Sequence, residues 1–483
     1  MLIDRIDRAI GLASERAVSS HHRRRLRKVS WERALDPSGR ERWASGEPAP
    51  RQGCSLEVLI DGETALPAIA DAIAAASSHV HIAGWFASPD FELKRGNGAS
   101  RLRDLLAEVA ERIPVRVLLW AGSPAPVFSP TRKTVREVRD ELTSGTQIRC
   151  GLDAREHPIH CHHEKIVIAD EETAFVGGID LTELGGDRYD HPHHPHREGL
   201  GWHDAASRLR GPIVGDVAGH FALRWKEITG EVLEPAPPAQ HTRAGEQTVQ
   251  LLRTIPQGVY ERVPLGDYRI LEAYVRALRS AERLIYIENQ FLWSPEIIEI
   301  LAGKLADPPT PEFRIVVLLP VRPNNGADVT RGQAGELARV DDGAGRFVAC
   351  SIYARDVSGD PTPVYVHSKI CIVDDQWLTL GSANLNERSL FNDSEANVCC
   401  EDEGLATELR ERLWAEHLEM PIEHVRARDA VDLVDNAWSP IATEQAERRD
   451  NDQPLTHRLV RLPGVSRRSR RLLGPLDSLF VDG

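Results

Sequence analysis

The sequence predicts an α/β fold made of two similar α/β/α sandwich domains, related by a pseudo-twofold axis with an active site at their interface. Three observations predict it. Short apolar stretches alternate with stretches of helical period, first from residue 56 and again from residue 249. A polar, proline-rich segment separates the two series. One short polar motif occurs once in each series, at matching distances.

The first half should alternate strands and helices. A helix is expected over 102–113 because Leu102, Leu105, Leu106 and Val109 have the i, i+3, i+4, i+7 spacing of one helix face. Thr64 is expected to cap an earlier helix. In order, we expect a strand at 56–60, a helix at 65–76, a strand at 79–86, the helix at 102–113 and a strand at 115–120.

The second half repeats this order. His81–Phe86 and Tyr286–Phe291 occupy equivalent places, 82 and 81 residues before the two motif histidines. Asp267 and Ser294 are expected to begin helices. In order, we expect a strand at 249–252, a helix from 267 to 281, a strand at 284–288, a helix from 294 and a strand at 313–319.

Composition predicts the domain boundaries and favours a cytoplasmic protein without a membrane span. We expect a charged, partly ordered N-terminal extension at 1–50, a first domain at 51–235, a linker at 236–247, a second domain at 248–430 and a C-terminal tail at 431–483. No apolar run is long enough for a membrane span, and no signal peptide is evident. Seven cysteines without paired spacing suggest reduced thiols and a cytoplasmic protein.

The formal net charge of −14 argues against a nucleic acid as partner. Two local runs are nevertheless basic, HHRRRLRK at 21–28 and RRSRR at 467–471. Such runs are usually solvated surface, but they are also suited to phosphate headgroups. A peripheral contact with a membrane surface is the sharper hypothesis for them.

The repeated motif is H-x-K-x4-D. It reads His163, Lys165, Asp170 in the first half and His367, Lys369, Asp374 in the second, 204 residues apart. Each copy is followed at one offset by a small pair, Gly177-Gly178 or Gly381-Ser382, and then by Asp180 or Asn384. A single copy would be unremarkable, but two copies with matching neighbours indicate one site made by both halves.

The residue types indicate phosphoryl transfer without a metal or cofactor. On an extended segment His163 and Lys165 share one face, as do His367 and Lys369. Two ammonium groups can stabilise the charge of a phosphoryl transition state, while one imidazole attacks phosphorus and the other protonates the leaving group. The backbone and side chains at Gly178, Ser382, Asp180 and Asn384 are candidate substrate contacts. Asp170 and Asp374 should point to the opposite face, in a structural role.

The two motifs resemble the paired HKD motifs of the phospholipase D superfamily. Further segments resemble its eukaryotic-type branch: Tyr286–Phe291 (YIENQF), Gly177–Leu181 (GGIDL), Arg188–Asp190 (RYD) and Trp202–Asp204 (WHD). The resemblance covers roughly 56–421, and it leaves no room for the C2, PX or PH domains of that branch.

This resemblance implies residue roles and a substrate class. His163 resembles the nucleophile, His367 the general acid and base, Lys165 and Lys369 the phosphate clamps. Asp190 and Glu395, ten and eleven residues past Asp180 and Asn384, are candidates to orient the imidazoles. The implied substrate is a phospholipid at a membrane surface, with water or an alcohol as acceptor. If the acceptor is phosphatidylglycerol, the enzyme is a cardiolipin synthase.

Three other interpretations remain at this point. One is a nuclease that uses the same histidines, and another is a lipid-binding scaffold without catalysis, which intact motifs disfavour. The third concerns metal: a zinc site is conceivable among the many histidines, but no cysteine pair accompanies them, so loop histidines near a phosphate pocket are preferred. The histidines concerned are His157, His160, His162, His163, His191, His193, His194 and His196.

Overall fold

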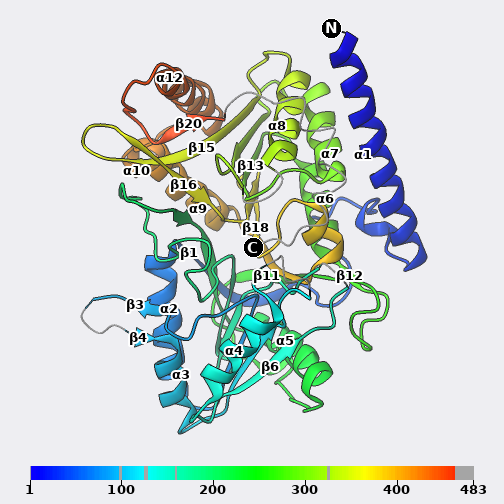
Figure 1. Cartoon of the computed structure of the whole chain (residues 1–483). Coiled ribbons are helices and arrows are strands. Elements are labelled where there is room, and N and C mark those ends of the chain that lie inside the picture. The colour runs from blue at the N-terminus through cyan, green and yellow to red at the C-terminus, as the bar shows by residue number, and fades with distance from the viewer. Residues whose placement is uncertain (1, 97–99, 125–128, 158–159, 324–326, 463–483) are drawn as a thin grey trace.

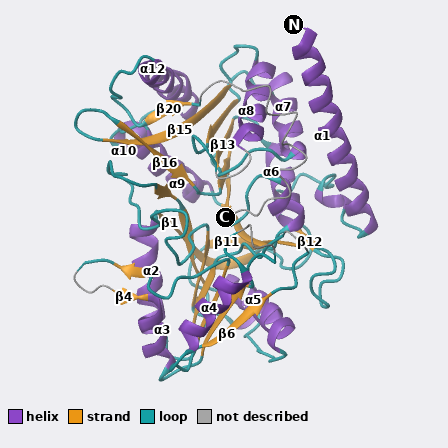
Figure 2. Cartoon of the chain, in the orientation of Figure 1, coloured by secondary structure: helices purple, strands orange, loops and turns teal. Residues whose placement is uncertain are grey.

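The computed structural model describes residues 2–96, 100–124, 129–157, 160–323 and 327–462. Its strands form one long mixed sheet, with helices on both faces, that runs through both halves of the chain (Figure 1). Figure 2 shows the strands in the middle of the molecule and the helices around them. The first half lies in the lower part of this view and the second half in the upper part.

The sheet of the first half has a mixed topology. The two steps from β6 to β5 and from β5 to β2 are parallel, and the remaining steps through β7, β8 and β10 to β1 are antiparallel. The strands are β1 (Arg51–Ile60), β2 (Val80–Gly84), β5 (Val115–Trp120), β6 (Arg149–Asp153), β7 (Ile166–Ala169), β8 (Thr173–Gly177) and β10 (Ala205–Arg210). A separate small sheet pairs β3 (Glu92–Lys94) with β4 (Ser100–Arg101).

The second half repeats this topology step for step. The order runs from β15 through β14, β13, β17, β18 and β19 to β11, again with two parallel steps first. The strands are β11 (Gln247–Ile255), β13 (Leu284–Glu288), β14 (Arg314–Leu318), β15 (Phe347–Arg355), β17 (Ile370–Val373), β18 (Trp377–Gly381) and β19 (Glu395–Glu401). The remaining strands are β9 (Gly201–His203), β12 (Asp267–Tyr268), β16 (Pro361–Val366) and β20 (Leu459–Arg461).

The two half-sheets join edge to edge. β1 and β11 pair antiparallel, with Arg51 opposite Val249 and Cys54 opposite Gln247. A second junction is parallel: β9 of the first half pairs with β16 of the second. The predicted fold class, two similar halves around a pseudo-twofold axis, is confirmed.

Helices cover both faces, as a buried mixed sheet requires. One core, under α5 (Ile213–Thr229), α9 (Glu403–His417) and α12 (Ser439–Asp450), is shared by the two halves. On the other face, α2 (Gly62–Ala75), α3 (Leu102–Ala110) and α4 (Arg132–Thr143) pack on the first half. There α6 (Arg269–Ser280), α7 (Pro295–Ala306) and α8 (Ala327–Asp341) lie on the second half.

The expected elements agree closely with the structure at the strands 115–120 and 284–288 and less closely at helix starts. Thr64 lies inside α2, whose N-cap position is held by Asp61 instead. The Asp61 side chain makes no capping hydrogen bond to its own helix. This carboxylate is held by other partners.

The N-terminal segment contains an unpredicted helix, α1 (Leu2–Lys28), which lies along α7 at the edge of the molecule (Figure 1). The His22 imidazole is 2.7 Å from the Glu296 carboxylate and stacks on Phe391 at 3.9 Å between ring centroids. The basic run 21–28 therefore belongs to an attached helix, on which Arg24, Arg27 and Lys28 are exposed. The second half of this helix, residues 14–28, is rich in charged and polar residues and has only three apolar ones, so the helical pattern is weak there.

The expectation of a tail from residue 431 is wrong for the part that the structure describes. Leu433, Val434 and Trp438 are buried in the shared core, and β20 pairs with β15. The second basic run, 467–471, lies outside the described residues. Remaining short elements are η1 (Glu32–Ala34), η2 (Pro238–Gln240), η3 (Arg388–Asn392), α10 (Ile422–Arg426), α11 (Ala430–Leu433) and η4 (Val434–Trp438).

The aspartates of the two motifs hold equivalent turns. Asp170 follows β7 with φ 58°, and its carboxylate accepts backbone N–H groups of Ser77, Ser78 and His79 at 2.7, 2.7 and 3.1 Å. Asp374 follows β17 with φ 56° and accepts those of the three residues 282–284 at 2.8–2.9 Å. Each carboxylate thus holds the chain that enters β2 or β13, and neither is directed at the histidines of its motif.

This geometry predicts a purely structural effect of Asp170→Ala. The change leaves three partly exposed backbone donors without their acceptor, which should cost about 1–2 kcal/mol of unfolding free energy. Urea unfolding measures that cost, while the folded enzyme that remains should keep a kcat/KM within about twofold of wild type. Glu108→Ala, which removes an exposed carboxylate on α3, is the control. A loss of catalytic efficiency by two orders of magnitude or more, without a loss of stability, would contradict the structural role.

Candidate active site

The two motif histidines lie where the backbones of the halves meet. His163 precedes β7, and its N–H donates to the carbonyl of Ser394 in the second half at 2.8 Å. His367 precedes β17, and its N–H donates to the carbonyl of His203 in the first half at 2.8 Å. Both imidazoles are buried. Each half therefore fixes the backbone that carries the other half's histidine.

The halves also exchange carboxylates. The Nδ1 atom of His163 is 3.2 Å from both carboxylate oxygens of Glu395, a residue of the second half. The Nδ1 atom of His367 is 2.6 Å from Oδ2 of Asp204, a residue of the first half. Each imidazole is thus oriented through its Nδ1 atom by a carboxylate of the other half, and Nε2 is its second ring nitrogen.

Asp204 and Glu395 occupy the same position in the two sheets. Asp204 comes two residues before Ala206, which pairs with Gly177, and Glu395 comes two residues before Asn397, which pairs with Gly381. The predicted residue Glu395 is thus beside a motif histidine. Asp190 is not: its carboxylate is 3.3 Å from Nδ1 of His194 and also pairs with Arg197.

The sequence offset from Asp180 predicted Asp190 instead of Asp204, because the loop between the equivalent strands is longer in the first half. β8 and β10 are separated by residues 178–204, whereas β18 and β19 are separated by residues 382–394. The sequence feature that could have indicated Asp204 is the Trp202-His203-Asp204 segment. Strand register, rather than sequence offset, identifies the equivalent residue.

The two lysines come directly before the strands of their motifs, Lys165 before β7 and Lys369 before β17. Nζ of Lys165 donates to the carbonyl of His163 at 2.6 Å and is 3.1 Å from Oδ2 of Asp180. Lys369 makes the equivalent bond to the carbonyl of His367. Both ammonium groups are thereby held beside the histidine of their own motif, and Asp180 balances the first of them.

In the second half an amide takes the place of that carboxylate. Oε1 of Gln290 is 3.5 Å from Nζ of Lys369 and 3.3 Å from Nδ2 of Asn384. Gln290 comes from the YIENQF segment just past β13, and its sequence position alone did not predict a role for it. The second motif's ammonium group therefore has a neutral partner where the first has an anion.

Gly178 and Ser382 support the carboxylates instead of facing substrate with their backbones. Their N–H groups donate to the carbonyls of Ala205 and Ala396 at 2.9 and 3.0 Å. A Cβ atom on Gly178 would lie 2.2 Å from Oδ1 of Asp204, so only glycine leaves room for that carboxylate. The Ser382 hydroxyl donates to Glu395.

Arg188 adds a third buried cation. Its guanidinium lies 3.3 Å from the centroid of the Trp202 ring, and its Nη2 donates to the carbonyl of Leu184 at 2.8 Å. Its Nε and Nη1 are buried without a hydrogen-bond partner. The Trp202 ring in turn lies 4.3 Å from the His367 ring. Unsatisfied donors on a buried cation are costly, and an anion would satisfy them.

Burial and the gathered cations shift the protonation of the site. Burial, together with Lys369, Arg188 and Lys165, lowers the pKa of His367 well below its usual value. Burial lowers the pKa of Lys369 to about 7, and Lys165 adds to the effect. Burial raises the pKa of Asp204 to about 7 and that of Glu395 to about 8. The pocket therefore resists further positive charge until an anion enters.

Comparison with known proteins gives a consistent family. The model for phospholipase D matches residues 72–201, and the model described as cardiolipin synthase, phospholipase D-like domain, matches residues 274–416. Phospholipase D alpha 1 of Nicotiana tabacum is 25% identical over 79% of this chain and 68% of its own length. Phospholipase D2 of Bos taurus is 25% identical over 73% of this chain and 50% of its own length.

A solved structure agrees with the fold. Phosphatidylserine synthase of Haemophilus influenzae superposes with a TM-score of 0.50 at 14% identity, over 82% of this chain and 93% of that one. The family models match one half of the chain each, and each match includes or borders the motif of its half. This chain accordingly belongs to the phospholipase D superfamily and is a phospholipase D-like phosphodiesterase.

Proposed function

We propose that this protein cleaves the headgroup phosphodiester of phospholipids through a phosphohistidine intermediate and passes the phosphatidyl group to water or an alcohol. The observation that carries the proposal is the reciprocal pairing of His163 with Glu395 and of His367 with Asp204. It orients two imidazoles from opposite halves beside buried cations, an arrangement suited to in-line transfer at one phosphorus.

In the first step Nε2 of His163 attacks phosphorus, and the bond to the headgroup oxygen breaks. The leaving alkoxide takes a proton from Nε2 of His367. In the second step His367 removes a proton from water or an alcohol, which attacks the phosphohistidine and releases His163. Each histidine thus ends the cycle in the protonation state in which it began.

The electrostatics of the pocket make this proton transfer depend on substrate. Three nearby cations keep the His367 imidazole neutral. The short contact between Nδ1 of His367 and Oδ2 of Asp204 holds one proton between these two groups. An incoming phosphodiester offsets the positive charge and favours the imidazolium form of His367. Lys165, Lys369 and the unsatisfied donors of Arg188 are the proposed contacts of the phosphoryl oxygens, together with Asn384.

A lipid is the favoured substrate class because the curated relatives are phospholipases D. None of the helices in the described ranges is long and apolar enough to cross a membrane. We propose that the exposed basic residues of α1 make a peripheral contact with anionic headgroups. The match of the second half to a cardiolipin synthase model favours one further acceptor, phosphatidylglycerol.

The first prediction concerns substrate and acceptor. Purified protein incubated with phosphatidylcholine and ethanol should form phosphatidylethanol as well as phosphatidic acid, because an alcohol and water compete for one intermediate. Thin-layer chromatography or mass spectrometry of the lipids measures both. A panel including phosphatidylethanolamine, phosphatidylglycerol and single-stranded DNA sets the scope. Cleavage of DNA without turnover of any lipid would reject the lipid substrate.

The second prediction separates the roles of the two carboxylates. Asp204→Asn and Glu395→Gln should each lower kcat about 10²–10⁴-fold with phosphatidylcholine. With phosphatidyl-p-nitrophenol the leaving group needs no proton, so Asp204→Asn should then release nitrophenol in a burst close to that of wild type. Glu395→Gln should stay slow, because it disturbs the nucleophile.

The matched control is Glu401→Gln, at the opposite end of the strand that carries Glu395, where the side chain is exposed. It should leave both rates unchanged. Bursts that are equally slow in Asp204→Asn and Glu395→Gln would contradict the separate assignment of acid and nucleophile.

The third prediction concerns pH. The profile of kcat/KM should be bell-shaped, because His163 must be neutral and Lys369 charged in the free enzyme. Since burial lowers the pKa of Lys369 to about 7, its ammonium form is complete below that pH and is lost above it. Lys369→Arg replaces it with a group that stays charged and should move the alkaline limb upward by at least one pH unit. The matched variant Lys165→Arg should leave that limb in place, and an alkaline limb unmoved by Lys369→Arg would refute the assignment.

A further inference from the structure

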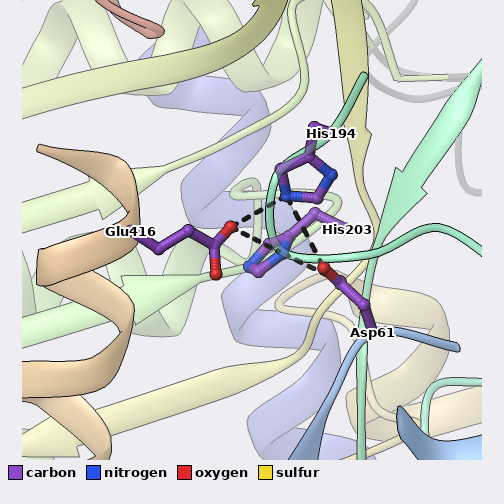
Figure 3. A group of neighbouring side chains, drawn as sticks. All are labelled: Asp61, His194, His203 and Glu416. Atoms are coloured by element: carbon purple, nitrogen blue, oxygen red, sulfur yellow. Dashed lines mark hydrogen bonds and ion pairs between the residues drawn. The ribbon is translucent and has the colours of Figure 1, made fainter. Parts of the chain in front are cut away.

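Four ligand-type side chains meet in a buried cluster at the interface of the two halves, close to the active site. We name it the interface cluster, and its members are Asp61, His194, His203 and Glu416 (Figure 3). They come from the turn between β1 and α2, from the loop before β9, from β9 itself and from α9. Three of the side chains are at most 2% exposed, and that of Glu416 is 10% exposed.

The spacing of the ligand atoms fits one small ion. Nε2 of His194 is 2.8 Å from Oε1 of Glu416 and 3.6 Å from Oδ2 of Asp61. Nδ1 of His203 is 3.0 Å from Oδ1 of Asp61 and 3.9 Å from the same Glu416 oxygen. A tetrahedral Zn²⁺ site with bonds of about 2.0–2.1 Å has ligand atoms about 3.3 Å apart, within the range observed.

The outer nitrogens of both imidazoles are bonded to further carboxylates. Nε2 of His203 is 3.0 Å from Oε2 of Glu288, and Nδ1 of His194 is 3.3 Å from Oδ2 of Asp190. Histidines that ligate a metal almost always have such a partner, because it fixes the tautomer and turns the other nitrogen inward. Two carboxylate–histidine pairs therefore converge on one point, as Figure 3 shows for the inner atoms.

Polar atoms inside the cluster are left unsatisfied. Oδ2 of Asp61 and Nδ1 of His203 are buried and make no hydrogen bond. Asp61 stands at the N-cap of α2, yet its carboxylate makes no capping bond and points into the cluster instead. Oδ2 of Asp61 has an imidazole nitrogen 3.6 Å away but no hydrogen bond, and a directly bound cation would offset the cost of burying this carboxylate oxygen.

The charge inside the cluster also suits a cation. The two imidazoles share the inside of the cluster with the carboxylates of Asp61 and Glu416, whereas the outer carboxylates Glu288 and Asp190 are also paired with His417 and Arg197. A divalent ion would balance the carboxylates of Asp61 and Glu416 while the imidazoles bind it as neutral ligands.

We propose that the interface cluster binds one Zn²⁺ ion. Two imidazole nitrogens with two carboxylate oxygens favour zinc over Mg²⁺ or Ca²⁺, which prefer oxygen ligands alone. Because the protein supplies all four ligands, the site is structural and leaves no position for a reacting water. The sequence disfavoured zinc for lack of a cysteine pair; the structure brings carboxylates from distant segments in their place.

The ion would stiffen the catalytic machinery without contacting phosphate. The carbonyl of His203 accepts the N–H groups of His367 and Ser368 at 2.8 and 3.0 Å, and the next residue is Asp204. The proposed ion thus fixes the segment that orients His367. It also joins α9 of the second half to β9 and the β1–α2 turn of the first.

The test is metal binding by the full-length protein without an affinity tag. After dialysis against dipicolinate, titration with Zn²⁺ should show one tight site per chain by elemental analysis and raise the melting temperature by 5 °C or more. Co²⁺ in its place should give the visible d–d bands of a tetrahedral site. His194→Ala and Glu416→Ala should lose the Co²⁺ bands and lower the Zn²⁺ affinity at least 100-fold.

His193→Ala is the matched control, because this exposed histidine lies in the same loop outside the cluster. It should keep full binding. If His194→Ala fails to fold, the Co²⁺ spectrum and stoichiometry of the wild-type chain decide alone. Less than 0.2 zinc per chain after titration, octahedral Co²⁺ bands, or binding lost in His193→Ala but kept in Glu416→Ala would each overturn the proposal.

Discussion

The structure depends on a reciprocal exchange between its halves. The imidazole of each motif is oriented by a carboxylate of the other half, and its backbone N–H is bonded to the residue just before that carboxylate. Neither half holds a complete site. Two strand junctions, β1 with β11 and β9 with β16, join the halves in the arrangement that makes this exchange.

The same exchange concentrates charge where water is excluded. Three cations and three carboxylates, Asp180 among them, lie around the histidines, and burial disfavours the ionised forms of Lys369, Asp204 and Glu395. The buried charged groups of this site lack some of their hydrogen-bond and charge partners when the site is empty, and a phosphodiester would supply them. Part of the free energy that folding spends on burying these groups is therefore recovered when the transition state binds. The structural aspartates Asp170 and Asp374 lie apart from this charge and serve the turns instead.

Much of this architecture could be predicted from the sequence. Period-2 and period-3.6 patterns revealed the alternating strands and helices, and the motif spacing revealed the two halves. Residues that act beside the histidine of their own motif, such as Lys165 and Lys369, followed from local alternation. Asp204 and Gln290 did not, because their roles depend on strand register and on contacts across the interface. Helix α1 was missed because its many charged residues and polar second half weaken the helical pattern, and it packs on α7.

The direct measurement of the central claim is a crystal structure with vanadate, which adopts the geometry of the phosphoryl transition state. The reciprocal exchange predicts one vanadium with Nε2 of His163 at one apex, a ligand oxygen hydrogen-bonded to Nε2 of His367 at the other, and Lys165 and Lys369 on the equatorial oxygens. Vanadate bound beside one histidine while the other lies out of reach of its oxygens would contradict it.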